Sequence, residues 1–291
     1  MPSFSLSRKL YIIIILNKFY FAACPSSASQ YEEILKGTKY MYIVFLILLI
    51  AFLIVEGILS INDVKKLKDT VISENIRVKL YRESIIWQWA PIVCILLIYA
   101  FSYVSFQDIG LGWIYLWGPL WFRIIIFVLC GGFLALLLYQ IFAYIVSAKF
   151  REQAKEKFAS NESSKNHYDA VMANVMIPRT KKEKTWFLFL TASAGICEET
   201  VWRGFLFFLL QTVFPSWSII IVVAVASLVF GVGHLYQGPA GFAKTSLFGA
   251  LFGCLYVATG SLLPGMLLHF VADYSSAFIL SEDLSEDICC K

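Results

Sequence analysis

Long apolar runs alternate with short polar segments along most of this chain. A helix needs about 20 mostly apolar residues to cross a bilayer, and several runs approach or exceed that length. The pattern predicts helical spans at residues 40–61, 85–106, 124–147, 186–212, 218–235, 241–258 and 262–280. Between the second and third, the aromatic segment 113–122 contains a Gly-Pro break, so we expect it to lie at the membrane interface or to re-enter.

Composition supports the same class. Of 291 residues, 59% are hydrophobic and only 15% are charged, whereas charged residues make up about 25% of a typical soluble domain. We therefore predict an all-α fold, a polytopic transmembrane helical bundle of about seven to eight spans. The net charge of +4 is modest and resides mostly in two loops, so we expect a membrane partner and no nucleic acid.

Loop charge predicts a topology and a division of the chain. The loops at 62–84 and 148–185 are rich in Lys and Arg, which places both on the cytoplasmic side. The predicted parts are an N-terminal arm with a short hydrophobic, signal-like segment (1–39), N-terminal transmembrane helices with basic loops (40–185), a catalytic transmembrane core of four helices (186–280) and an acidic tail (281–291). The seven cysteines show no metal-ligand spacing and are interpreted as small buried hydrophobes.

A charged cluster interrupts the predicted span 186–212. Two carboxylates and a guanidinium at Glu198, Glu199 and Arg203 would together cost on the order of 8–10 kcal/mol in hydrocarbon. At about 100° per residue, Glu199 and Arg203 share a helix face, while Glu198 points about 100° away from Glu199 and has no cation on its own helix. An unpaired carboxylate at low dielectric suits general acid or base catalysis near neutral pH. The alternative is a structural ion-pair cluster that holds helices together.

Two histidines also fall within apolar spans, where histidine is rare. His234 ends the fifth span, and His269 lies one turn before Asp273 in the seventh, where the carboxylate can orient the imidazole and select its tautomer. Glycines flank these positions and allow close helix approach: Gly195, Gly204, Gly231, Gly233 and Gly265. Water activation for acyl hydrolysis, a zinc site and a proton-coupled transport path all fit these groups, and spacing alone does not choose among them.

Three motifs occur in order along the C-terminal spans: Glu-Glu-x-x-x-Arg at 198–203, Phe-x-x-x-His at 230–234 and His-x-x-x-Asp at 269–273. Together they resemble the CPBP family, which contains the type II CAAX prenyl proteases and related bacteriocin-processing and immunity membrane proteins. The resemblance implies an intramembrane glutamic endopeptidase that needs no metal or other cofactor. It further implies a peptide or protein substrate, with lipidated proteins among the candidates, and a multi-pass protein of the bacterial inner membrane.

The resemblance also implies roles for individual residues. Glu198 would activate the attacking water with help from His234, and His269 and Asp273 would stabilise the oxyanion. Glu199 and Arg203 would hold the local geometry. Asp273 stands where the prenyl-protease branch has asparagine. An ionised aspartate only accepts hydrogen bonds, so Asp273 would have to be protonated or act through His269.

Two other hypotheses about the function remain open from the sequence alone. One is a non-catalytic immunity or scaffold protein that keeps the motifs for binding, and the other is a zinc-dependent membrane protease. The remaining charges within apolar runs, Glu56 and Lys244, are expected to reach the headgroups with their side chains rather than to take part in catalysis.

Overall fold

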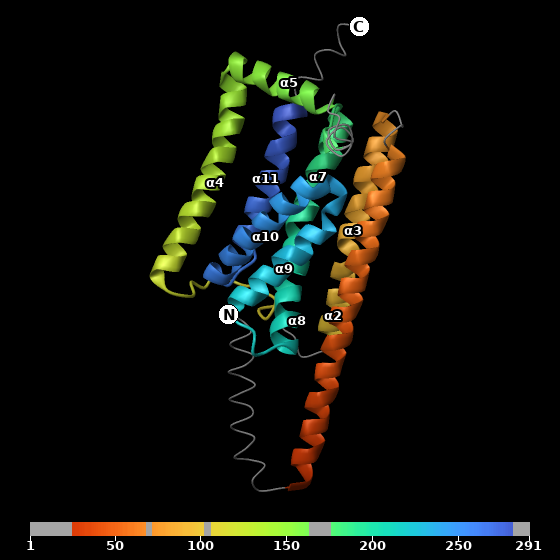
Figure 1. Ribbon diagram of the computed structural model, residues 1–291, viewed down its shortest axis with the longest axis vertical. Coiled ribbons are helices and arrows are strands. Elements are labelled where there is room, and N and C mark those ends of the chain that lie inside the picture. Colours follow the sequence, from red (N-terminus) through yellow and green to blue (C-terminus); the bar gives the residue numbers. More distant parts are fainter. Residues whose placement is uncertain (1–24, 68–71, 102–105, 163–175, 282–291) are drawn as a thin grey trace.

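All secondary structure in the described residues is helical (Figure 1). The computed structural model describes residues 25–67, 72–101, 106–162 and 176–281. In chain order, the elements are α2 (Pro25–Leu67), α3 (Glu74–Phe101), α4 (Leu120–Val146), α5 (Ala148–Glu162), α7 (Lys181–Glu198), the π-helix η1 (Glu199–Phe205), α8 (Leu206–Val213), α9 (Ile219–Gly233), the 3₁₀ turn η2 (Leu235–Gln237), α10 (Gly238–Thr259) and α11 (Leu263–Ser281).

The apolar runs correspond to these helices, and the predicted all-α membrane bundle is confirmed. Among the described residues, three helical stretches are long and apolar enough to cross a bilayer: Tyr40–Leu67, Leu120–Val146 and Leu235–Thr259. A fourth apolar helix, Ile219–Gly233, is shorter. That the other predicted spans also cross the membrane stays a prediction, as do the boundaries of the four predicted parts. Helix α2 begins at Pro25, inside the predicted N-terminal arm, and residues 1–24 lie outside the described residues.

The continuous helix formed by α7, η1 and α8 lies at the centre of the bundle (Figure 1). It contacts α3 and α2 on one side and α9, α10 and α11 on the other, and α4 packs against α10 and α11. The α8 segment is the most apolar and best buried part of this helix, with Leu206, Phe208 and Leu209 almost fully buried. This burial fixes the central helix, and with it the charged cluster at the α7–η1 junction.

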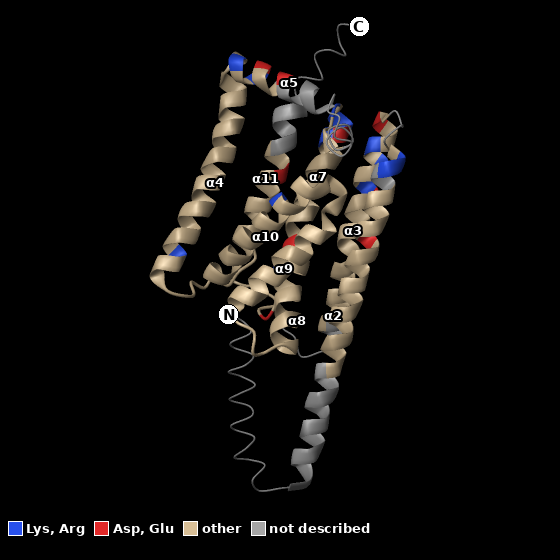
Figure 2. Cartoon of the chain, in the orientation of Figure 1, with Lys and Arg blue, Asp and Glu red and all other residues tan. Residues whose placement is uncertain are grey.

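Basic side chains gather at one end of the bundle. Figure 2 shows the described Lys and Arg residues concentrated where α2 ends, where α3 and α7 begin, and along α5. The described parts of the two basic loops therefore lie at the same end, as the charge pattern predicts. That this end faces the cytoplasm stays a prediction.

The aromatic segment between α3 and α4 is not helical and packs on the turn between α10 and α11. The backbone N–H of Tyr115 donates to the Thr259 carbonyl at 2.6 Å, and the N–H of Trp117 donates to the Ala258 carbonyl at 3.0 Å. Leu262 N–H in turn donates to the Gly110 carbonyl at 3.0 Å. These bonds fix the start of α11, and hence the position along the bundle of the histidine that this helix carries.

Candidate active site

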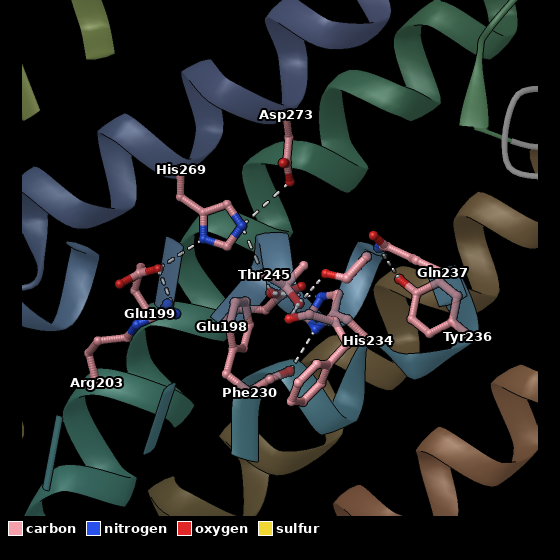
Figure 3. Close-up of polar contacts among 12 residues, drawn as sticks. Glu198, Glu199, Arg203, Phe230, His234, Tyr236, Gln237, Thr245, His269 and Asp273 are labelled. Atoms are coloured by element: carbon pink, nitrogen blue, oxygen red, sulfur yellow. Dashed lines mark hydrogen bonds and ion pairs between the residues drawn. The ribbon is translucent and has the colours of Figure 1, made fainter. Parts of the chain in front are cut away.

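The structure brings all six predicted site residues together at the meeting point of three helices (Figure 3). Glu198 is the last residue of α7, and Glu199 and Arg203 lie in η1. His234 caps the C-terminus of α9. His269 and Asp273 come from α11 and point back toward the α7–η1 junction (Figure 3).

The helix is not regular where it carries the cluster. Residues Glu199–Phe205 form a π-helix, with the N–H of Leu206 bonded to the carbonyl of Val201, five residues earlier. The expectation of a uniform 100° per residue is therefore wrong from Glu199 onward, because a π turn contains more residues than an α turn. Such segments occur frequently at functional sites.

The predicted Glu199–Arg203 ion pair is present and fully buried. Arg203 Nη1 donates to Glu199 Oε1 at 3.0 Å, and the side chains are 2% and 1% exposed. The guanidinium also lies over the Phe230 ring, 4.3 Å from its centroid. Two buried charges that are mutually compensated and hydrogen-bonded can persist in a membrane bundle where single charges could not.

Glu199 has a second partner that the sequence did not predict. His269 Nδ1 lies 2.9 Å from Glu199 Oε1, so the ring donates its Nδ1–H to that carboxylate. The expectation that Asp273 selects the tautomer of His269 is therefore corrected, since Asp273 Oδ2 lies 3.5 Å from the opposite nitrogen, Nε2. The spacing along the chain favoured Asp273 because it is one turn away, whereas the contact with Glu199 arises from packing α11 against η1.

Both imidazoles direct their Nε2 atom toward Glu198. His234 Nδ1 donates to the Phe230 carbonyl at 2.8 Å, which leaves Nε2 directed at the site. Glu198 Oε2 lies 3.9 Å from His234 Nε2 and 3.8 Å from His269 Nε2. These distances exceed a direct hydrogen bond and suit three groups that surround one small polar molecule, such as a water.

The environment of Glu198 supports a chemical role. Its Oε2 atom is buried and has no hydrogen-bond partner among the described residues, although its side chain is 20% exposed. A carboxylate oxygen held in this way can accept a proton from a molecule placed between the rings. No group of three or more His, Cys, Asp or Glu in the described part of the chain is arranged to hold a metal ion.

Two further residues near the site were not predicted to belong to it. Tyr236 in η2 accepts a hydrogen bond from Gln237 Nε2 at 3.2 Å, and its ring lies 5.8 Å from that of His234. Glu56 in α2 is close enough to Glu198 for their charges to interact. It is the only charged residue in the apolar run 40–61, and that rarity was the available signal. The expectation that Glu56 reaches the headgroups stays a prediction.

Fold and site together define an integral membrane protein of helices with a buried cluster of carboxylates and imidazoles. Residues 181–275 match the family model described as Type II CAAX prenyl endopeptidase Rce1-like. This match confirms the resemblance to the CPBP/CAAX protease family over the C-terminal region and indicates a CAAX-protease-like peptidase. Comparisons with curated proteins and with solved structures gave no match. The matched segment contains all six site residues.

Proposed function

We propose that this protein is an intramembrane endopeptidase in which Glu198 is the general base. The observation that carries the proposal is the position of Glu198 Oε2, unpartnered among the described residues and within 3.9 Å of the Nε2 atoms of both His234 and His269. Two helices other than the one that carries Glu198 supply these rings, so the arrangement depends on the fold of the whole C-terminal region.

The geometry supports the following reaction. A water between Glu198 Oε2 and His234 Nε2 gives one proton to the carboxylate as its oxygen attacks the peptide carbonyl carbon. The carbonyl oxygen becomes an oxyanion near His269 Nε2. When the tetrahedral intermediate collapses, the C–N bond breaks and Glu198 returns the proton to the leaving amine. The products are an amine and a carboxylic acid, which keeps the second proton of the water until it ionises, and Glu198 is regenerated.

His269 can stabilise an oxyanion only if Nε2 carries a proton, because Nδ1–H is already donated to Glu199. Two carboxylates favour the imidazolium: Glu199 at 2.9 Å from Nδ1 and Asp273 at 3.5 Å from Nε2. Of the two alternatives for Asp273, this arrangement supports the one in which it acts through His269.

The proposed substrate is a peptide or protein that reaches the site from the membrane. The family description names prenylated CAAX substrates for that family. Asp273 replaces the asparagine of the prenyl-protease branch, so lipidated proteins are candidates among others. We further propose, from the resemblance, a location in a bacterial inner membrane.

Two substitutions test this function. Glu198→Gln keeps the size of the side chain but removes the base, and His234→Ala removes a water partner, so each should lower cleavage by about 10²-fold or more. The control is Glu152→Gln, an exposed carboxylate on α5, which should cleave like the wild type. Cleavage is measured on a membrane-peptide reporter, and the substrate is sought by comparing membrane peptides from cells with wild-type or Glu198→Ala protein.

The outcomes separate the alternatives. Full turnover by Glu198→Gln would refute the assigned base. If both variants cleave nothing and yet keep the biological activity of the wild type, the protein acts as a non-catalytic immunity or scaffold protein. Turnover that requires stoichiometric zinc would favour the metalloprotease reading.

A further inference from the structure

A cavity of about 230 Å³ lies between α3 and the α7–η1 helix. Ile196 and Thr200 contribute from the central helix, on either side of Glu198 in sequence and on the helix face that points away from it. The full lining is Trp89, Ile92, Ile95, Leu96, Tyr99, Phe106, Ile109, Leu111, Ile196, Thr200 and Phe205. No residue of the candidate active site is among them, so the cavity is a separate feature.

The chemistry of the lining favours an apolar guest. Every lining side chain except Thr200 is aliphatic or aromatic, and the polar atoms of Thr200 and Trp89 are already hydrogen-bonded. Trp89 Nε1 donates to Ser193 Oγ at 2.5 Å, and Thr200 Oγ1 donates to the Ile196 carbonyl at 2.7 Å. A water needs two to four polar partners, whereas an apolar cavity of about 150 Å³ stays dry and binds benzene. Filling the space with hydrocarbon restores dispersion contacts that its walls would otherwise lack.

The mouth of the cavity lies on an apolar outer surface. The lining residues Leu96 and Ile196 are 47% and 44% exposed, so they mark the edge of the opening. Next to them on α3, Val93 and Leu97 are 54% exposed. These residues belong to the predicted spans 85–106 and 186–212, whose outer apolar faces would contact lipid tails, so we expect the opening to lead to the hydrocarbon of the bilayer.

We propose that this cavity binds the end of one hydrocarbon chain of a bilayer lipid. Volume, lining and outlet agree on this ligand: the space exceeds that of a benzene-binding cavity, the walls are apolar, and the mouth faces lipid. Thr200 and Phe205 belong to η1, so the bound chain contacts the back of the π-helix that carries Glu199 and Arg203. The proposal concerns binding and does not depend on the proposed peptidase activity.

Photolabelling in a bilayer tests the proposal. The full-length protein is reconstituted, without substrate, in vesicles of phosphatidylcholine that carries a diazirine near the end of one acyl chain, and adducts are mapped by mass spectrometry. We expect adducts on lining residues that the lipid cannot reach from outside, namely Ile95, Ile109 and Phe205, which are 5%, 2% and 3% exposed.

Two neighbouring positions on α3 give a matched pair of variants. Leu96→Trp narrows the mouth and should reduce adducts on those buried residues tenfold or more. Leu97→Trp adds the same side chain beside the mouth and should leave the adducts unchanged, because Leu97 does not line the cavity. Ile95→Phe, which fills the cavity from within, is a second variant that should also reduce labelling.

Absence of adducts on the buried lining residues of the wild type would overturn the proposal. Equal labelling of Ile109 and Phe205 in the wild type, Leu96→Trp and Ile95→Phe would overturn it too. Since neither result involves peptide cleavage, failure of this proposal is distinguishable from failure of the proposed function.

Discussion

At the scale of single residues, Glu199 is the centre of the polar network. One carboxylate oxygen accepts both from Arg203 at 3.0 Å and from His269 at 2.9 Å, and the residue is 1% exposed. Removing one partner of such a buried pair leaves an uncompensated charge, which typically costs about 3–5 kcal/mol. Glu199 thus links the ion pair of the central helix to the imidazole of α11. Glu198, one residue earlier, stays available for chemistry.

Asp273 gives the sharpest prediction at this scale. Asp273→Asn should keep cleavage near the wild-type rate, because the amide can donate directly to the oxyanion that His269 faces. Asp273→Ala removes the carboxylate 3.5 Å from His269 Nε2 and supplies no donor in its place, so it should lower kcat by about 10²-fold. Steady-state kinetics on one peptide substrate measure both. Equal, near-wild-type rates for the two variants would show that position 273 has no part in catalysis.

The identity of the site residues was predictable from sequence because charge and imidazole are rare in apolar spans. Glu198, His234 and His269 stand out on that ground alone, and the structure brings them together. The bond between Glu199 and His269 was not predictable, because it joins positions 70 residues apart through helix packing. Glu56 was visible as an isolated acid, but its proximity to Glu198 depends on where α2 packs.

At the scale of helices, close approach of α7 and α11 sets the geometry of the site. A Cβ atom added to Gly195 would lie 2.8 Å from the Met266 carbonyl oxygen and 3.3 Å from the Phe270 backbone nitrogen. Both neighbours are backbone atoms, which cannot move aside without moving α11. This contact lies one turn before Glu198 on α7 and flanks His269 on α11. The sequence predicted close approach from Gly195, and the structure adds the partner.

Gly195→Ala should therefore push α11 away from α7 and separate His269 from Glu198. We expect a loss of about 1–3 kcal/mol in stability from overpacking and a larger relative loss of cleavage, since sub-ångström placement matters for catalysis. The matched control is Gly131→Ala in α4, where an added Cβ meets nothing within 4 Å. It should leave both thermal unfolding and cleavage unchanged. If Gly195→Ala also behaves like the wild type, the tight α7–α11 contact is not required.

Helix positions followed from the apolar runs, but two departures from regular structure did not. The sequence of η1 predicts an ordinary α-helix around a charged cluster. Only the backbone hydrogen bonds of the structure show that this segment is a π-helix. The aromatic segment before α4 was expected at the interface because of its composition. Its bonds to Thr259 and Ala258 depend on the tertiary arrangement. In both cases the deciding contacts are made by backbone groups, which carry no sequence signal.

At the scale of the whole molecule, the charge distribution and the central helix give the bundle two distinct ends. Basic residues collect at the end where α7 begins (Figure 2). The continuous helix from α7 to α8 covers residues 181–213. At about 1.5 Å per residue it is longer than the roughly 30 Å hydrocarbon core. We therefore expect its two ends to lie on opposite sides of the membrane, with the basic end in the cytoplasm by the positive-inside rule.

Cysteine labelling tests this orientation. Lys182→Cys, at a position with a 55% exposed side chain at the basic end, should react with a membrane-impermeant maleimide only after the membrane is opened. Ser216→Cys, exposed in the turn after α8, should react in intact cells. A background with Cys289→Ser and Cys290→Ser removes labelling of the predicted cytoplasmic tail. Asp273, whose side chain is 44% exposed, lies on the half of α11 nearer the α5 end, so in this orientation we expect the site to open toward the cytoplasm. The reverse labelling pattern would invert the topology and place the entrance of the site on the outer face.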